Sequence, residues 1–141
     1  MFASSTRPTD AYSKVGLETG VDIANPHRLI LMLLDGAILA LGSAGQAMKE
    51  KNIGEKGKLI STAIDIISGG LQASVDVQAG GKLSERLVAL YDYMCQRLLY
   101  ANLKNDLAAI EEVSGLLGEI RSAWQEIATD PAVVSGNKAA A

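Results

Sequence analysis

Between residues 25 and 49 the chain reads NPHRLILMLLDGAILALGSAGQAMK. The asparagine can cap exposed backbone N–H groups, and the proline after it is preset for the first helical position, so a helix is predicted to begin here. Its core stripe at helical spacing includes Leu33, Ala37 and Leu41, yet apolar residues also project well away from that stripe. The segment therefore predicts a long helix that is apolar nearly all round.

Three further segments with helical periodicity follow this one. The predicted helices span about residues 25–49, 58–77, 83–103 and 107–128, with a charged, glycine-bearing connection at 50–57. Gly80-Gly81 is expected to end the second helix, and the core stripe of the third is expected to start at Leu83. Four similar helices with short links predict an all-α fold, an antiparallel up-and-down four-helix bundle.

The two ends of the chain carry weaker patterns. The segment 11–21 is too short and too interrupted by glycine to form a stable helix alone. It is therefore expected to pack against a larger part of the protein. Residues 1–10 and 130–141 show no amphipathic pattern and are expected to be flexible. The predicted organisation is a flexible N-terminus at 1–10, a single helical domain at 11–129 and a flexible tail at 130–141.

Composition excludes several classes of protein. The 141 residues, 48% of them hydrophobic, suffice for one domain with a substantial core. The net charge of −3 and the absence of a dense basic cluster argue against nucleic acid or an anionic membrane as the main partner. A membrane-spanning helix needs about 20 apolar residues, far more than the longest strongly apolar run at 29–34, so no membrane insertion is expected.

The single cysteine and the N-terminal sequence bear on where the protein works. Cys95 has no partner for an intramolecular disulfide, which is typical of a reducing compartment. The first residues have no apolar core after a basic start, so they do not form a secretory signal peptide. The cytosol is therefore the expected location.

Apolar residues outside the core stripes form the most informative pattern in the sequence. A helix of a simple bundle needs only one buried face, so a second apolar stripe must be covered by something else. Burying each such side chain is worth about 1.5–3 kcal/mol, so several together could drive the docking of another helix. The predicted docking surface on the first three long helices comprises Leu31, Met32, Leu34, Ile38, Leu39, Leu59, Ile66, Ala73, Val88, Cys95, Leu99 and Leu103.

Catalytic and metal-binding patterns are not found in the sequence. His27 is the only histidine, and without a Glu-x-x-His pair a surface or capping role is expected rather than a metal site. Cys95 has no basic neighbour in sequence, which favours a packed thiol over a nucleophile. No catalytic residue, metal site or cofactor is predicted, and the protein is not expected to be an enzyme.

Three other residues carry weaker expectations. Helical periodicity points Tyr91 inward and leaves Tyr93 the more exposed of the pair. Asp35 lies among apolar residues, either as a polar outer position or as a hydrogen-bonding group that fixes a neighbouring segment. Tyr12 in the N-terminal segment is either simply exposed or inserted into a groove, where it would be displaceable.

The same segments resemble those of the flagellar secretion chaperone FliS family from about residue 11 to residue 131. Each motif is weak alone, but their order and spacing are specific. The similar segments are Ala11-Tyr12 with Val15, Asn25-Pro26-His27, Leu29-Ile30, Leu33, Asp35-Gly36-Ala37, Leu90-Tyr91-Asp92-Tyr93-Met94, Leu98-Leu99, Ala101-Asn102-Leu103, Asn105-Asp106, Ala109-Ile110-Glu111-Glu112-Val113 and Ala123-Trp124. Leu34 departs from the family, which usually carries an aromatic residue before Asp-Gly-Ala.

The resemblance implies a cytoplasmic export chaperone for flagellin. It implies a four-helix bundle with a short N-terminal helical segment packed on it, around which the disordered C-terminal region of flagellin folds in a one-to-one complex. The segment containing Tyr12, Val15 and Leu17 would cover part of the flagellin-binding surface and be displaced. Binding would prevent premature polymerisation, and the complex would be delivered to the export gate of the flagellar type III apparatus.

Two other classes of function compete with the chaperone. A self-associating helical adaptor could hide the outer stripes in a homodimer. An enzyme with a site in the bundle core ranks last, because the sequence lacks the inward carboxylates and histidines that such a site needs.

Overall fold

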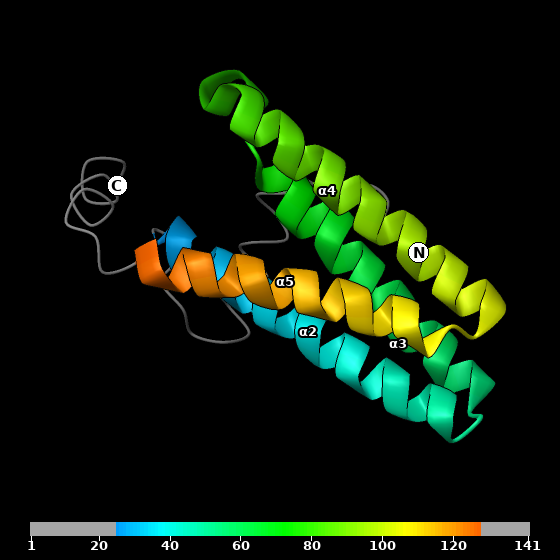
Figure 1. Ribbon diagram of the computed structural model, residues 1–141. Helices are drawn as coiled ribbons and strands as arrows, with labels where there is room; N and C mark the ends of the chain where they lie inside the picture. The colour runs from blue at the N-terminus through cyan, green and yellow to red at the C-terminus, as the bar shows by residue number, and fades with distance from the viewer. Residues whose placement is uncertain (1–24, 128–141) are drawn as a thin grey trace.

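A bundle of four long helices makes up the protein in the computed structural model, which describes residues 25–127. The long helices are α2 (Pro26–Lys49), α3 (Ile53–Asp65), α4 (Val77–Lys104) and α5 (Leu107–Ile127). Two short elements extend α3, a π-helix η1 (Ile66–Leu71) and a 3-10 helix η2 (Gln72–Ser74). The described residues contain no strand, and the all-α four-helix bundle predicted from the sequence is confirmed (Figure 1).

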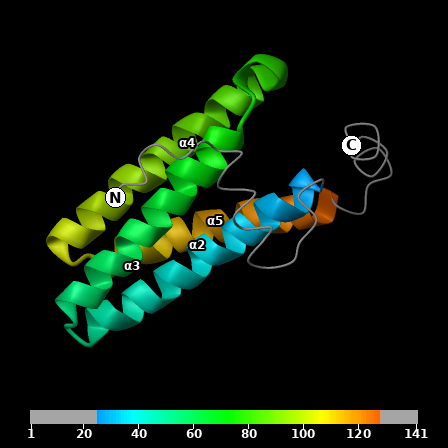
Figure 2. The same cartoon turned by 180° about the vertical axis from the view of Figure 1, so that it is seen from behind.

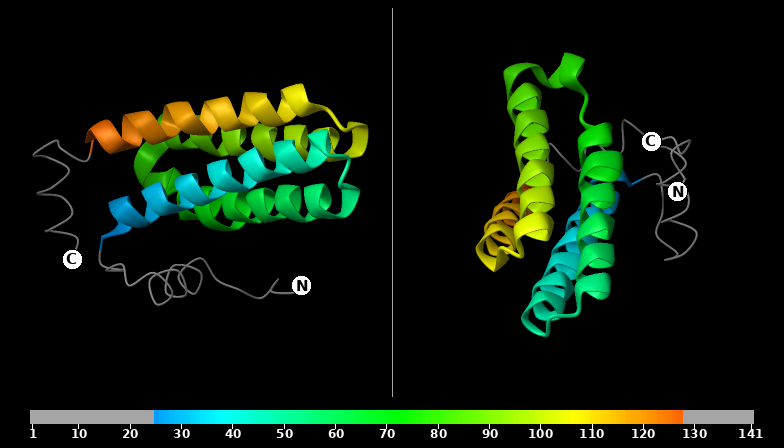
Figure 3. Two further views of the ribbon diagram at one scale, coloured as in Figure 1. Left: turned by 90° about the horizontal axis from the view of Figure 1, so that it is seen from below. Right: turned by 90° about the vertical axis from the view of Figure 1, so that its right-hand side faces the viewer.

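Each long helix packs against two neighbours in a closed ring. The contacts join α2 to α3 and α5, and α4 to α3 and α5. Figures 1 and 2 show that the pair α2 and α5 and the pair α3 and α4 diverge toward the end of the bundle where α2 and α4 begin. Seen from below in Figure 3, the helices run alongside one another. The bundle is therefore closed at one end and open at the other.

Helix α2 supplies the centre of the core. Asn25 accepts a hydrogen bond from the backbone N–H of Arg28 at 3.2 Å, which confirms the helix start expected from the Asn-Pro pair. Ala37 and Leu41 are fully buried, and α2 packs between α3 and α5. By length and a mean hydropathy of 1.7, α2 could also cross a membrane, but its apolar residues serve here as the core of a bundle.

The second predicted helix differs from the structure at both ends. It begins at Ile53 rather than near residue 58, because Asn52 accepts a hydrogen bond from the N–H of Glu55 at 3.3 Å and caps it. Regular α-helix ends at Asp65 and continues as η1 and η2 until Val75 turns extended. The wider π turn brings Gly70 against Leu33, where an added Cβ would lie 3.2 Å from both Leu33 methyl carbons.

Helix α4 begins earlier than predicted. Asp76 accepts a hydrogen bond from the N–H of Ala79 at 3.0 Å and caps the helix, so Gly80 and Gly81 do not end the preceding helix. Gly81 has φ +60° and ψ −138°, which breaks the helical geometry and is a conformation that only glycine adopts readily. Leu83 was wrongly placed in the core, because this kinked first part of α4 stands clear of α2 and leaves Leu83 76% exposed.

Helix α5 agrees with the sequence-based prediction. Asp106 accepts a hydrogen bond from the N–H of Ala109 at 3.3 Å, as expected of the helix cap in this tight corner. Val113 and Leu117 are fully buried, whereas the glutamates of α5 are exposed. Ala128, the expected end of this helix, and the predicted flexible segments at both termini lie outside the described residues.

Candidate functional site

Part of the predicted docking surface lies along the seam between α2 and α3. Gly36 sits opposite Ile66, because a Cβ added at Gly36 would lie 3.5 Å from the Ile66 Cδ1 atom. Helical spacing places Met32 and Leu39 on the same side of α2 as Gly36. We call Met32, Leu39, Leu59 and Ile66 the α2/α3 seam; Leu39 is 72% exposed and the other three are half-buried.

A second part lies along the seam between α3 and α4. The register of these helices follows from two contacts, Lys56 to the backbone of Asn102 and Gln72 to the backbone of Val88. On the side of α4 that faces α3, helical spacing aligns Val88 with Cys95, Leu99 and Leu103, which we call the α3/α4 seam. Leu99 and Leu103 are 60% and 77% exposed, so apolar surface is open on both sides of α3.

The remaining predicted residues do not join either seam. Leu34 is wrongly assigned to the surface, because α2 packs against both α3 and α5 and its buried stripe is wide enough to enclose Leu34 completely. Leu31 and Ile38 share the side of α2 that carries Asp35, and Asp35 faces α5 by pairing with Arg121. Ala73 is exposed on η2, beyond the π-helical turn.

The ion pair between Asp35 and Arg121 decides between the two roles that the sequence left open for Asp35. The guanidinium of Arg121 donates to both carboxylate oxygens of Asp35, and its Nη1 atom donates to Gln125 Oε1 at 2.8 Å. Asp35 therefore hydrogen-bonds to α5 and helps to fix that neighbouring helix, although the pair is solvent-exposed and adds little to stability.

The thiol of Cys95 is part of the α3/α4 seam and is half-buried. Partial burial is the main cause that raises its pKa, and the carboxylates of Asp92 and Asp65 raise it further. A raised pKa keeps the sulfur protonated, so it lacks the thiolate character of a nucleophile. This agrees with the expectation of a packed thiol.

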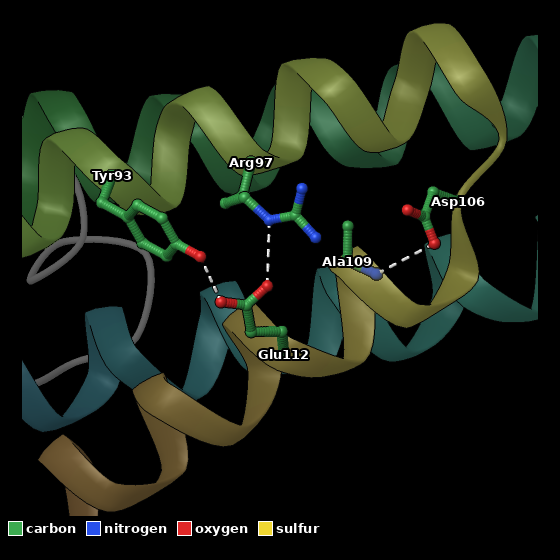
Figure 4. Close-up of polar contacts among 5 residues, drawn as sticks. All are labelled: Tyr93, Arg97, Asp106, Ala109 and Glu112. Carbon is green, nitrogen blue, oxygen red and sulfur yellow. Dashed lines mark hydrogen bonds and ion pairs between the residues drawn. The ribbon is translucent and has the colours of Figure 1, made fainter.

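On the opposite side of α4, polar contacts hold α4 to α5. Figure 4 shows Tyr93 and Arg97 of α4 converging on Glu112 of α5. The hydroxyl of Tyr93 donates to one carboxylate oxygen, and Arg97 Nε donates to the other at 2.9 Å. Both hydrogen bonds favour the charged carboxylate and lower the pKa of Glu112, with that from Tyr93 as the larger cause. Tyr93 is 41% exposed and Tyr91 is buried, as expected.

The Glu112 carboxyl is expected to titrate below its ordinary pKa of about 4.5. A lowered folded-state pKa means that the contribution of this group to stability is present at neutral pH and is lost as the pH falls through the folded-state pKa. We expect Tyr93→Phe to raise the Glu112 pKa, because it removes the larger of the two hydrogen bonds. Carbon-detected NMR titration measures the effect, with Tyr100→Phe as the control; equal pKa values in wild type and Tyr93→Phe would contradict the assignment.

His27 and Trp124 join the start of α2 to the end of α5. The His27 Nε2 atom donates to the backbone oxygen of Trp124 at 2.7 Å, and the Trp124 Nε1 atom donates to the backbone oxygen of His27 at 2.9 Å. The two rings stack with centroids 4.8 Å apart. His27 is only 8% exposed, so a surface position for it was wrong; it contacts a distant carbonyl that sequence spacing cannot reveal.

Lys56 is a structural residue that the sequence analysis missed. Its side chain is 3% exposed, and its Nζ atom donates to the backbone oxygen of Asn102 at 2.9 Å and to Asn105 Oδ1 at 2.6 Å. Asn105 ends α4 in the left-handed conformation with φ +52°. The ammonium group therefore caps the end of α4 from α3; a lysine in a charged connection gives no signal of this role.

Among residues 25–127, no group of three or more His, Cys, Asp or Glu side chains is arranged to hold a metal ion. No buried side-chain nitrogen or oxygen of this part of the chain lacks a hydrogen-bond partner. The arrangement offers exposed apolar surface on either side of α3, and polar contacts to α5 occupy the other side of α4. The exposed apolar surface suits the bundle to binding a protein segment.

Over most of its length the chain is similar to known flagellar proteins. The family model "Flagellar protein FliS" matches residues 8–131. The chain is 49% identical over 117 residues to the flagellar secretion chaperone FliS of Salmonella typhimurium, which covers 83% of this chain and 87% of that protein. It is 41% identical over 134 residues to FliS of Escherichia coli, with 95% and 97% coverage, and 32% identical over 109 residues to FliS of Bacillus subtilis, with 77% and 80% coverage.

The family-model match, residues 8–131, includes the whole described bundle and extends beyond it at both ends. The named relatives are chaperones, a role without catalysis, which agrees with the lack of a catalytic pattern in this sequence. The chain belongs to the flagellar secretion chaperone FliS family, and it is a chaperone rather than an enzyme.

Proposed function

We propose that this chaperone binds the disordered C-terminal region of flagellin in the cytoplasm, in a one-to-one complex. The observation that carries the proposal is the exposed apolar surface on both sides of α3, where Leu39, Leu99 and Leu103 are each at least 60% exposed. A disordered client, by which we mean the exported protein, can wrap such a surface and fold on it. Covering this region of flagellin prevents premature polymerisation and keeps it ready for delivery to the flagellar type III export apparatus.

The two seams are the proposed flagellin-binding surface. Met32, Leu39, Leu59 and Ile66 contribute on one side of α3, and the α3/α4 seam contributes on the other. The predicted cap formed by Tyr12, Val15 and Leu17 lies outside the described residues and remains a proposal: without flagellin it covers part of this surface, and flagellin displaces it. Delivery to the export gate is proposed for the complex as a whole.

Calorimetric titration tests the proposal with full-length flagellin and with flagellin truncated at its C-terminus. We expect one-to-one binding that is lost on truncation, and a weakening of at least about tenfold for Leu99→Asp, because a charge replaces an apolar contact worth about 1.5–3 kcal/mol. Ala89→Asp is the matched control, since Ala89 is exposed on the same helix but outside the seam.

Two outcomes would sink the proposal. Equal binding of full-length and truncated flagellin would remove the C-terminal region as the client segment. If neither form bound while circular dichroism showed an intact helical fold, the homodimeric adaptor would become the leading function, and sizing of the purified protein would then be expected to give a dimer.

A further inference from the structure

A hairpin at the open end of the bundle contributes no buried residue to the core. It comprises residues 72–90, which form η2, the extended Val75 and the first half of α4, and we call it the arm. The buried residues of α4 all follow it, from Tyr91 to Ala101, whereas α2 buries a residue in every turn. Figure 3 (right) shows this end of α3 and α4 standing clear of α2 and α5. The arm is the longest stretch of residues 25–127 without a buried residue.

The arm is only weakly stabilised by the rest of the bundle. Val75, Leu87 and Leu90 are half-buried against the core, and Leu83 is 76% exposed. Gly81 interrupts the helix with φ +60°, and glycine is, after proline, the poorest helix former. Segments that bury little apolar surface open locally at a free energy well below that of global unfolding. The arm has the properties of such a segment.

One side chain ties the two limbs of the arm together. Gln72 Nε2 donates to the backbone oxygen of Val88 at 3.1 Å and to Asp92 Oδ1 at 2.8 Å. Gln72 begins the arm, and its two partners lie at the other end of it. Separation of the limbs must therefore break both hydrogen bonds together. We expect the arm to open as one unit rather than residue by residue.

The contacts of Glu112 lie within one turn of the end of the arm. Tyr93 and Arg97 of α4 both donate to this carboxylate on α5, and Met94 between them has no exposed surface. At this level α4 is held to α5 by hydrogen bonds and also packs into the core. An opening that starts in the arm must break both kinds of contact to continue along α4.

We propose that the arm is a unit of local unfolding, which opens and closes while α2, α3 and α5 stay folded, and that the contacts of Glu112 stop the opening at Tyr93. In the open state Val75, Leu87 and Leu90 lose their contacts with the core and become accessible. The exchange thus controls how much apolar surface the chaperone presents. It is a property of the bundle itself, so it does not depend on the proposed binding of flagellin.

Native-state hydrogen exchange of the full chain, followed by NMR without flagellin, tests the proposal. The amides of residues 86–90 should share one protection factor, at least about a hundredfold below that of Leu41 in the core of α2. Gln72→Ala should lower the protection of these amides about tenfold and leave α2 unchanged, because a hydrogen bond to a charged group is among the stronger ones. Gln78→Ala is the matched control, since Gln78 is exposed in the same arm, and it should leave both unchanged.

A second pair of variants tests the boundary. Glu112→Ala should extend the low protection beyond Tyr93 to the amides of residues 94–97, whereas Glu111→Ala, at the neighbouring exposed glutamate, should not. Protection of the arm equal to that of Leu41 would overturn the proposal. So would protection that varies along the arm and responds to Gln72→Ala only at the nearest amides. Wild-type protection of residues 94–97 in Glu112→Ala would show that Glu112 does not stop the opening, and would overturn the proposal as well.

Discussion

Leu41→Ala will lower the free energy of unfolding by about 2–5 kcal/mol, the range for a large-to-alanine change in a core that cannot collapse around the cavity. The Leu41 side chain has no exposed surface, and α2 packs between two neighbouring helices. Loss of its contacts therefore cannot be compensated by solvent or by movement of a single partner. Urea unfolding followed by circular dichroism measures the change.

Leu39→Ala is the matched control, two residues away on the same helix and 72% exposed. It should change the free energy of unfolding by less than about 0.5 kcal/mol, as surface substitutions usually do. It should weaken flagellin binding instead, because Leu39 belongs to the proposed surface. Equal destabilisation by both variants would contradict the assignment of one face of α2 to the core and the other to the client.

Lys56→Met is expected to cost about 1.5–3 kcal/mol of stability, because hydrogen bonds from a charged donor are the stronger ones and the variant leaves their acceptors without it. Methionine keeps an unbranched side chain of similar size, so the loss isolates the ammonium group and its bonds to Asn102 and Asn105. Thermal and urea unfolding both measure it.

Lys58→Met provides the comparison, since Lys58 is exposed on the same helix. It should leave stability within about 0.5 kcal/mol of wild type. If Lys56→Met were as stable as Lys58→Met, the cap on α4 would contribute nothing, and the burial of Lys56 would have no energetic role.

Local sequence signals determined the number of long helices and several of their ends. Asn25 and Asp106 cap helices where their side chains can reach a nearby N–H group, and this needs no distant residue. The periodic apolar stripes likewise identified the core of α5 through Val113 and Leu117. The absence of a catalytic pattern and the order of the family motifs were also evident in the amino-acid order alone.

The tertiary structure decided how each helix is rotated about its axis and where the helix pairs diverge. Helical periodicity does not show whether an apolar residue beside the core stripe packs against a second neighbouring helix. Only the packed bundle shows that Leu34 is buried while Leu39 is exposed. The same rotation separates the outer residues into two seams on either side of α3. Divergence of the pairs leaves Leu83 exposed at the open end of the bundle. Contacts such as Lys56 with Asn102 and His27 with Trp124 join residues far apart in the chain, and only packing of the whole bundle brings them together.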